Sequence, residues 1–425
     1  MGDRYDAILA YIEGLEIVDT HEHLAGLEIS RERHTDVLRE YLGAYISGDL
    51  RSAGLGVAKL AYATDATQPL VARWETVEPY WELARHTGYG RSLDITVQAL
   101  YGLDGIRRET IVELNQAFLR TLEAPGHYQR VLKETSRIAV SLLDAEGPWD
   151  PAFFRPVARL DRFVMPLSLR TVIEVEEEYG IRVRSLDDWL GACEASLDSA
   201  REQGSVAIKN SDAYVRSLDF AFVPLREAER GIEAMRSLRH RPDWYEHPLH
   251  VDKAFQDAMF HHVLGLAERR EMPVQIHTGI QGGSGNLLTH SDPQLLNPLF
   301  VQYPGVKFDV FHIGYPYQHT LSALAKMFPN VYIDMCWAHI ISPTASVHAL
   351  AEWLDAVPVN KISAFGGDYA IVDAVYGHQW LARRNVAAAL ARKVDEGVFD
   401  VARACEIARL LFIDNPAELF GLELA

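Results

Sequence analysis

Eight short apolar runs, separated by longer amphipathic stretches, constrain the fold of this 425-residue chain more than any other feature. Near-continuously apolar strands that alternate with helices are typical of a parallel sheet covered on both faces. Eight such units predict an α/β fold, a (β/α)8 TIM barrel. A doubly wound open sheet is the alternative, and the lack of a glycine-rich fingerprint after the first strand weakens it. The predicted strands are residues 17–20, 137–143, 163–167, 206–208, 274–276, 306–311, 331–335 and 362–365, and the clearest helices are 186–203, 251–270, 321–328 and 345–356.

A long stretch after the first strand carries only helical patterns. Apolar residues recur at three- and four-residue spacing in residues 36–45, 74–86 and 109–123. A loop of this length is implausible as coil. We therefore expect one TIM-barrel domain over residues 1–425, with an inserted helical lid subdomain over residues 24–135 that covers the barrel mouth. Within it, residues 88–92 are predicted as a turn that carries Tyr89 and Arg91, with Arg91 the better candidate for a substrate contact.

Charge and cysteine content exclude several classes of protein. The formal net charge of −18 argues against a nucleic-acid-binding or anionic-membrane surface. Cys193, Cys336 and Cys405 lie far apart in sequence, which predicts neither a disulfide framework nor a thiolate metal site. Residues 1–15 lack the apolar core of a signal peptide, and no later segment is long enough to span a membrane. We expect a soluble, cytoplasmic protein that binds a small-molecule substrate; a homo-oligomer is left open.

The ends of the predicted strands carry the residues of chemical interest. His21 and His23 end the first strand, and because strand side chains alternate, both point the same way, roughly 7 Å apart. Two imidazoles so placed can bind one divalent transition metal. Polar residues also end the fourth, fifth, sixth and eighth strands: Lys209, His277, His312 and Asp368. In a barrel these ends meet at one mouth, so the six side chains are predicted to form a metal-ligand set.

This strand-end set resembles the amidohydrolase superfamily. The segments 208–216, 87–91 and 415–422 are similar to its amidohydrolase-2 branch, which includes TIM-barrel hydrolases, decarboxylases and modules fused to glutamine-synthetase-like domains. The resemblance covers nearly the whole chain. It does not identify a substrate, because this fold supports many reactions.

The resemblance implies a divalent metal cofactor, one or two ions per chain, with zinc expected first and manganese or iron as alternatives. It implies that His21, His23, Asp368 and His277 are ligands. His312 would bind a second metal or contact the substrate. Lys209 would be carboxylated and bridge two metals, as in binuclear relatives. Because a free ammonium would be repelled by two dications, the alternatives are a deprotonated Lys209 or one that faces an anionic substrate.

The predicted chemistry is hydrolysis of an amide or a related C–N or ester bond. A divalent metal lowers the pKa of bound water from about 15.7 to near 7. Asp368 would accept the water's proton and pass it to the leaving group, and His312 or His277 would steady the oxyanion. A polar and cationic set predicts a substrate that carries a carboxylate: Arg91, Tyr214 and Arg216.

The sequence leaves two alternatives to a hydrolase. A metal-dependent decarboxylase or uronate-isomerase-like enzyme would need the same ligands. A non-catalytic metal-binding barrel is disfavoured, because a structural site closes its coordination and has no need of a spare base such as Asp368.

Overall fold

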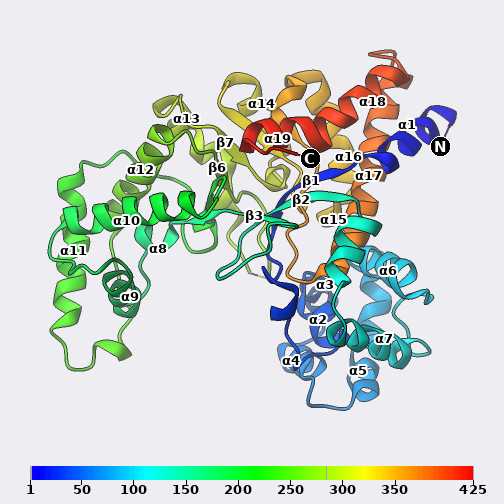
Figure 1. The fold of residues 1–425 in the computed structure, drawn as a ribbon, viewed down its shortest axis with the longest axis horizontal. Coiled ribbons are helices and arrows are strands. Elements are labelled where there is room, and N and C mark those ends of the chain that lie inside the picture. Colours follow the sequence, from blue (N-terminus) through cyan, green and yellow to red (C-terminus); the bar gives the residue numbers. More distant parts are fainter. Residues whose placement is uncertain (1, 284, 425) are drawn as a thin grey trace.

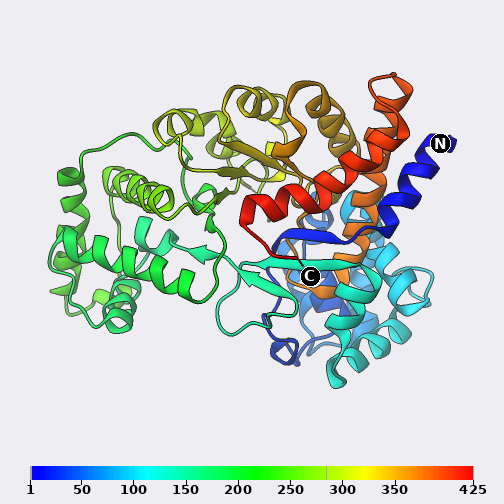
Figure 2. The ribbon, with the colours of Figure 1, turned by 45° about the horizontal axis from the view of Figure 1, so that its top comes forward.

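The computed structural model describes residues 2–283 and 285–424, and all of its strand pairs are parallel. The strands lie at the centre with helices around them (Figure 1, and Figure 2 from a turned view). They form two ladders, in the orders β1-β2-β3 and β4-β5-β6-β7-β8-β9. Their bounds are β1 Ile17–Glu22, β2 Ile138–Leu143, β3 Phe154–Pro156, β4 Ala158–Arg159, β5 Ile208–Asn210, β6 Val274–Ile276, β7 Phe308–Val310, β8 Val331–Asp334 and β9 Ile362–Ser363.

The two ladders join into one ring. Strands β3 and β4 are separated only by Val157, so a single extended segment pairs with β2 on one side and with β5 on the other. At the opposite seam, the backbone N–H of Thr20 donates to Phe365 O (3.1 Å), and that of Asp368 donates to His21 O (2.8 Å). Eight strand positions therefore surround the core, and the predicted α/β TIM barrel is confirmed.

The third predicted strand was wrong. Residues 163–167 lie in and after the short helix α8 (Asp161–Val164), where Phe163 packs against Trp189 with ring centroids 5.1 Å apart. Its apolar character comes from this helix packing and not from a strand. The true third strand, β3 with β4, contains Arg155, Pro156 and Arg159, which hide it from a search for apolar runs. The other seven predicted strands each overlap an observed strand.

The predicted outer helices are present. Residues 186–203 form α10 (Leu186–Glu202), which begins with a capping box between Ser185 and Asp188. The remaining helices outside the insertion are α1 Asp3–Gly14, α9 Leu169–Tyr179, α11 Leu225–Arg239, α12 Lys253–Arg269, α13 Asn297–Gln302, α14 Gln318–Met327, α15 Ala338–Ile341, α16 Pro343–Ala356, α17 Val372–Asp395, α18 Val401–Arg409 and α19 Asn415–Phe420.

The stretch between β1 and β2 is helical, as expected. It contains α2 Val37–Gly43, α3 Ile46–Ser52, α4 Val57–Thr64, α5 Leu70–Ala84, α6 Gly88–Tyr101 and α7 Ile111–Glu123, drawn in blue to cyan in Figure 1. Their buried apolar side chains form a core cluster that also takes in Phe311, Trp337 and Tyr369 from the strand-end segments. The insertion therefore packs against the end of the barrel where the candidate residues lie. Its role as a lid stays a prediction.

Residues 88–92 are not a turn but the first turn of α6. Thr87 caps this helix, since its hydroxyl accepts a hydrogen bond from Gly90 N (3.3 Å). A Cβ at Gly88 would lie 2.1 Å from Ile340 O, so only glycine lets the helix start approach that backbone. The glycines of this segment thus serve close helix packing. Within the described chain, every helix is too short or too polar to cross a membrane.

Candidate metal centre

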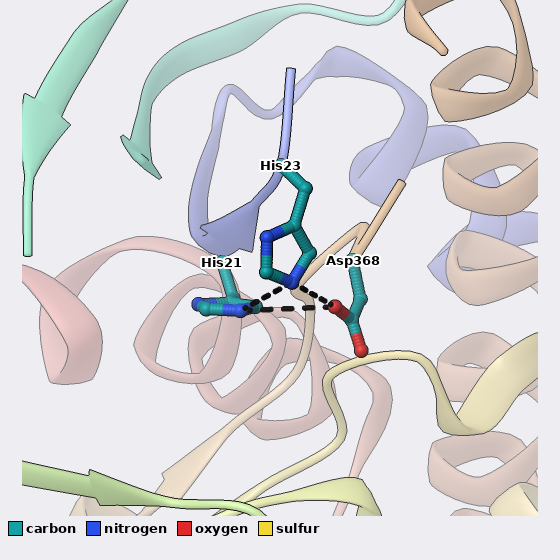
Figure 3. Close-up of side chains that lie close together, drawn as sticks. All are labelled: His21, His23 and Asp368. Carbon is teal, nitrogen blue, oxygen red and sulfur yellow. Dashed lines mark hydrogen bonds and ion pairs between the residues drawn. The ribbon is translucent and has the colours of Figure 1, made fainter. Parts of the chain in front are cut away.

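One group of metal-ligating side chains joins the first strand to the last. His21 and His23 come from β1 and the residue after it, and Asp368 comes from the segment that follows β9 (Figure 3). The Nε2 atoms of the two histidines are 3.2 Å apart. Asp368 Oδ1 lies 3.7 Å from His21 Nε2 and 3.2 Å from His23 Nε2. The three ligand atoms are within 4.8 Å of one another, so one ion can contact all of them.

The local charges in this group favour a cation. His23 Nδ1 lies 2.9 Å from the carbonyl oxygen of Asp144, to which it donates, so in the neutral ring Nε2 keeps its lone pair. That lone pair faces the carboxylate of Asp368. Burial lowers the pKa of His23, but the hydrogen bond to Asp368 raises it, and the net result is a pKa above the usual value. A bound cation would replace that proton.

A second group lies beside the first. His277, just after β6, and His312, after β7, place Nδ1 and Nε2 only 2.9 Å apart. The other nitrogen of each ring lies near a backbone carbonyl, His277 Nε2 at 3.0 Å from Ile280 O and His312 Nδ1 at 2.9 Å from Cys336 O. A neutral imidazole has one N–H group, and in each of the two rings this N–H donates to the backbone carbonyl. The two facing nitrogens therefore both present lone pairs.

This opposition of lone pairs fits a metal ion between the rings. Burial lowers the pKa of His277 well below its usual range and that of His312 to about 4, so both rings are neutral at pH 7. Without a proton to share, the two nitrogens repel each other at this distance. A divalent ion that accepts both lone pairs would remove the repulsion. The residues present thus fit a metal cofactor.

Asp368 links the two groups. Its Oδ1 faces the first pair of histidines, and its Oδ2 lies 3.7 Å from His312 Nε2. Burial alone would raise the pKa of the Asp368 carboxyl, but the hydrogen bond from His23 and the positive charge of Lys209 hold it below its usual value. The carboxylate is therefore ionised at neutral pH and able both to bind a cation and to accept a proton.

The backbone around Asp368 is tightly held. Its φ of 57° lies in the left-handed region, which is costly outside glycine and is kept only where neighbours enforce it. Gly367 N donates to Asp19 Oδ1 (2.9 Å), and Tyr369 N donates to Glu22 Oε2 (2.8 Å). A Cβ at Gly367 would lie 1.7 Å from Glu22 Oε1. Buried carboxyl groups of β1 thus clamp the segment that carries Asp368.

The sixth predicted ligand, Lys209, is buried on β5 at the same end of the barrel. Its Nζ lies 4.3 Å from the ring centroid of Phe311, whose ring also contacts His21 and His312 at centroid distances of 5.1 and 5.3 Å. Burial lowers the pKa of Lys209. The structure therefore brings Lys209 to the two groups, and whether it is carboxylated stays open.

Of the predicted substrate-binding residues, Tyr214 lies closest to the ligands. Its ring centroid is 4.7 Å from that of His277, and its hydroxyl accepts a hydrogen bond from Gly282 N (3.1 Å). Arg216 is instead buried in an ion pair with Asp257 on α12, at 2.6 Å. These contacts make Arg216 a support of the loop after β5 and not a free cation.

The first turn of α6 carries the predicted substrate contact Arg91 together with Tyr89. Arg91 has an exposed side chain in the first turn of that helix. Tyr89 of the same turn stacks on Tyr45, which donates a hydrogen bond from its hydroxyl to the carbonyl oxygen of Asp368. Tyr89, not Arg91, is therefore the residue of this turn that packs toward the site.

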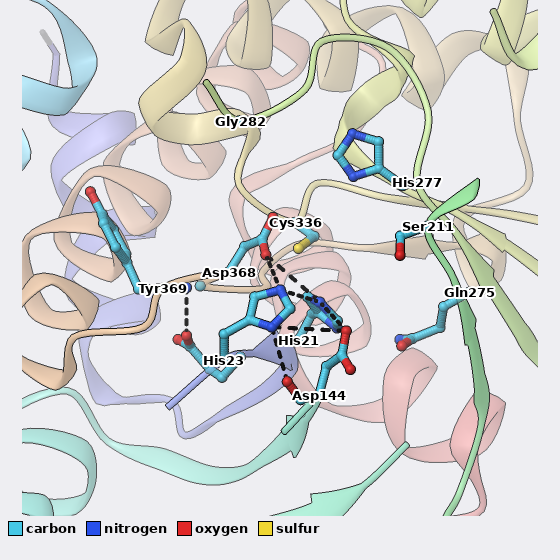
Figure 4. A network of polar contacts seen from close by, with 12 residues as sticks. His21, His23, Asp144, Ser211, Gln275, His277, Gly282, Cys336, Asp368 and Tyr369 are labelled. Carbon is cyan, nitrogen blue, oxygen red and sulfur yellow. Dashed lines mark hydrogen bonds and ion pairs between the residues drawn. The ribbon is translucent and has the colours of Figure 1, made fainter. Parts of the chain in front are cut away.

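Several residues of the site were missed from sequence. Asp144 follows β2, and its Oδ2 lies 3.7 Å from His21 Nε2 (Figure 4). The same oxygen lies 2.7 Å from Arg159 Nη1. The strand-end rule could have found Asp144, because it directly follows a correctly predicted strand. Arg159 was hidden by the error in the third strand. Tyr45 and Trp337 come from connecting segments, where sequence offers no signal.

A cavity of about 510 Å³ opens beside the first group. Its walls include His23 and Asp368, and the exposed fraction of the His23 side chain, 38%, shows that this imidazole is accessible from it. The insertion contributes Arg39 and Tyr45, and the loop after β6 contributes Gly282. The cavity has the size of a small-molecule site.

Solved structures show the same fold. A uronate isomerase from Thermotoga maritima is 17% identical, with a TM-score of 0.81 over 99% of this chain and 98% of that one. A glucuronate isomerase from Caulobacter crescentus is 18% identical, with a TM-score of 0.78 over 99% and 94%. A putative metal-dependent hydrolase from Lactobacillus casei is 19% identical, with a TM-score of 0.66 over 97% of each chain. At these identities the likeness concerns the fold alone.

Two sequence comparisons are more specific. Protein fluG from Emericella nidulans is 28% identical over 236 residues, 53% of this chain. The match spans only about a quarter, 26%, of that relative's length. The family model Amidohydro_2, described as amidohydrolase, matches residues 180–422, more than half of the chain. The chain therefore belongs to the amidohydrolase family.

Proposed function

We propose that the protein is a metal-dependent hydrolase that cleaves an amide, or a related C–N or ester bond, in a small substrate carrying a carboxylate. The observation that carries this proposal is the position of Asp368, an ionised carboxylate between two groups of imidazoles. A hydrolase needs both a cation-binding site and a base beside it, and Asp368 belongs to both. A purely structural metal site would have no use for such a residue.

The proposed ligands divide into two sets. His21, His23 and Asp368 would hold one divalent ion, and His277 with His312 and Asp368 would hold a second. Zinc suits nitrogen and carboxylate ligands at this spacing. Such an ion would supply Lewis-acid chemistry, polarising a substrate carbonyl and making water a stronger acid.

The protein's own groups would do the rest. Asp368 accepts a proton from the attacking water and returns it to the leaving group. The hydroxyl of Tyr45 and the carboxyl group of Glu22 hold the backbone of the segment that carries this carboxylate. Arg39, in the wall of the cavity beside Asp368, is the cation best placed to bind the substrate's carboxylate.

A second candidate is isomerisation of a uronic acid. It is supported by the likeness to uronate isomerases, which extends over 99% of this chain and so includes the helical insertion. A uronic acid also carries a carboxylate, and the same ligands would serve. Only the reaction itself distinguishes the two.

The test is a comparison of reactions on protein loaded with zinc, manganese or iron. Carboxylate-bearing amides and esters, aromatic carboxylic acids and hexuronates are supplied in parallel, and amine or alcohol, CO2 and ketose are measured. We expect release of an amine or alcohol. Arg39→Ala should raise KM for the substrate that is hydrolysed. Arg91→Ala, the matched control on the same insertion, should leave KM unchanged. Faster conversion of a hexuronate to a ketose than any hydrolysis would reject the proposal in favour of isomerisation.

A further inference from the structure

The turn after β8 brings a cysteine into the second group of ligands. Cys336 is fully buried, and its sulfur, a nitrogen of His312 and an oxygen of Asp368 all lie within 4.8 Å of one another. Figure 4 shows Cys336 beside the carboxylate of Asp368, with His277 nearby. We propose that Cys336 is a thiolate ligand of the second metal ion, together with His277, His312 and Asp368.

Two side chains, those of Asp334 and His312, fix the backbone of Cys336. Its N–H donates to Asp334 Oδ1 (2.7 Å), and its carbonyl oxygen accepts from His312 Nδ1 (2.9 Å). The second contact orients the His312 ring so that Nε2 points at His277. One residue therefore both aims the imidazole and presents its sulfur beside it. This is the arrangement by which outer contacts orient metal ligands.

The surrounding chain leaves room for the sulfur. A Cβ at Gly366 would lie 2.7 Å from Cys336 Sγ and 2.6 Å from Thr20 Oγ1, so any larger residue would push the thiol away. The next residue, Trp337, is held at a φ of 61°, a left-handed conformation that is a genuine outlier for a bulky side chain. Its N–H donates to Gly366 O (2.8 Å). Strain kept at such a place points to a functional constraint.

A buried cysteine alone would be an ordinary small apolar residue. The independent observation here is geometric: His277 Nδ1 and His312 Nε2 lie 2.9 Å apart, and the other nitrogen of each ring lies at a backbone carbonyl, which leaves a place for a cation at the two facing nitrogens. Sulfur donors prefer zinc, cobalt or iron to magnesium or manganese. The second position would therefore select a softer metal than the one formed by His21, His23 and Asp368. On binding, the thiol proton leaves to solvent as the sulfur–metal bond forms.

Cobalt(II) substitution tests this assignment, which rests on the proposed metal binding but not on the proposed reaction. Cobalt bound to a thiolate shows a sulfur-to-metal charge-transfer absorption in the near ultraviolet, and cobalt bound only to nitrogen and oxygen does not. We expect this absorption in the wild-type protein and its loss in Cys336→Ser. Cys193→Ser, in α10, and Cys405→Ser, in α18, are matched controls that should keep it.

A second measurement needs no variant. X-ray absorption at the zinc edge of the wild-type protein should show a sulfur neighbour at about 2.3 Å in addition to nitrogen and oxygen neighbours. A nitrogen and oxygen shell alone, or a charge-transfer absorption that persists in folded Cys336→Ser, would overturn the proposal. Both spectra are recorded without substrate, so absence of hydrolysis would refute the proposed function and leave this result standing.

Discussion

Replacing Gly367 by alanine should damage both stability and metal binding, although it adds only one methyl group. The new Cβ would lie 1.7 Å from Glu22 Oε1, and Glu22 is fully buried. The backbone at this glycine is outside the left-handed region, so the effect is steric and not a matter of φ. Overpacking of a rigid interior costs about 1–3 kcal/mol. If Glu22 yields, Tyr369 N loses its buried acceptor, at about 1–3 kcal/mol more.

The expected loss is therefore roughly 2–6 kcal/mol in the free energy of unfolding, a large part of the roughly 5–15 kcal/mol typical of a protein. Urea unfolding followed by tryptophan fluorescence measures it, and bound metal is counted in the same samples. Gly191→Ala in α10, where no atom lies within 4 Å of the added Cβ, is the control and should be neutral or stabilising by about 0.4–1 kcal/mol. A Gly367→Ala protein within about 0.5 kcal/mol of wild type, with unchanged metal content, would show that the clamp on Asp368 does not exist.

Four further predictions concern single groups. The double variant His21→Ala/His23→Ala should lose tight binding of at least one metal ion, measured by elemental analysis after dialysis; a full complement would refute the ligand assignment. Asp368→Asn should keep the fold and lower kcat by roughly 10²–10⁴, and near wild-type turnover with metal in place would rule out the proton shuttle. Lys209→Ala should keep its metal and raise KM, whereas loss of one ion, partly restored by a short carboxylate, would establish the carboxylated bridge. Asp373 is buried, and although burial alone would raise its pKa, hydrogen bonds from His127, Tyr101 and Tyr41 lower it to about 2. Because the folded-state pKa lies below the unfolded value, this stabilisation, roughly 2 kcal/mol, is present above about pH 4 and is lost as the pH falls towards 2. Asp373→Asn should therefore weaken the protein at pH 7 and flatten its acid unfolding curve; an unchanged curve would contradict the pKa.

The fold could be predicted because seven of the eight strands are buried on both faces and therefore appear as apolar runs. The prediction of the third strand was wrong because a search for apolar runs does not detect a strand that is short and interrupted, as β3 and β4 are. It carries Arg155 and Arg159, whose charge interrupts the apolar pattern, and Pro156, which is tolerated at a strand end. The nearby apolar run in α8 is buried by another helix, and periodicity over so few residues cannot tell the two apart.

The candidate ligands could be predicted by the same reasoning, because they lie at or after the ends of strands. His21 lies at the end of β1, and His277, His312 and Asp368 each follow a strand, so the topology alone brings them together. The residues that hold them could not be found in this way. Tyr45 and Trp337 reach the site from connecting segments, and their positions depend on tertiary packing. The proposed role of Cys336 has no signal in the spacing of the cysteines, because the groups beside it, His312 and Asp368, follow other strands.

The core shared between the insertion and the barrel end has a consequence for how the chain folds during synthesis. Helices α2 to α7 are synthesised before Trp337, Tyr369 and Leu381, which complete their apolar cluster and lie more than 200 residues further along the chain. The seam between Thr20 and Phe365 closes equally late. Contacts between such distant segments form slowly, and an unfinished apolar surface is prone to aggregation meanwhile. Truncated chains that end before Trp337 should consequently depend on chaperones, although they contain the whole insertion.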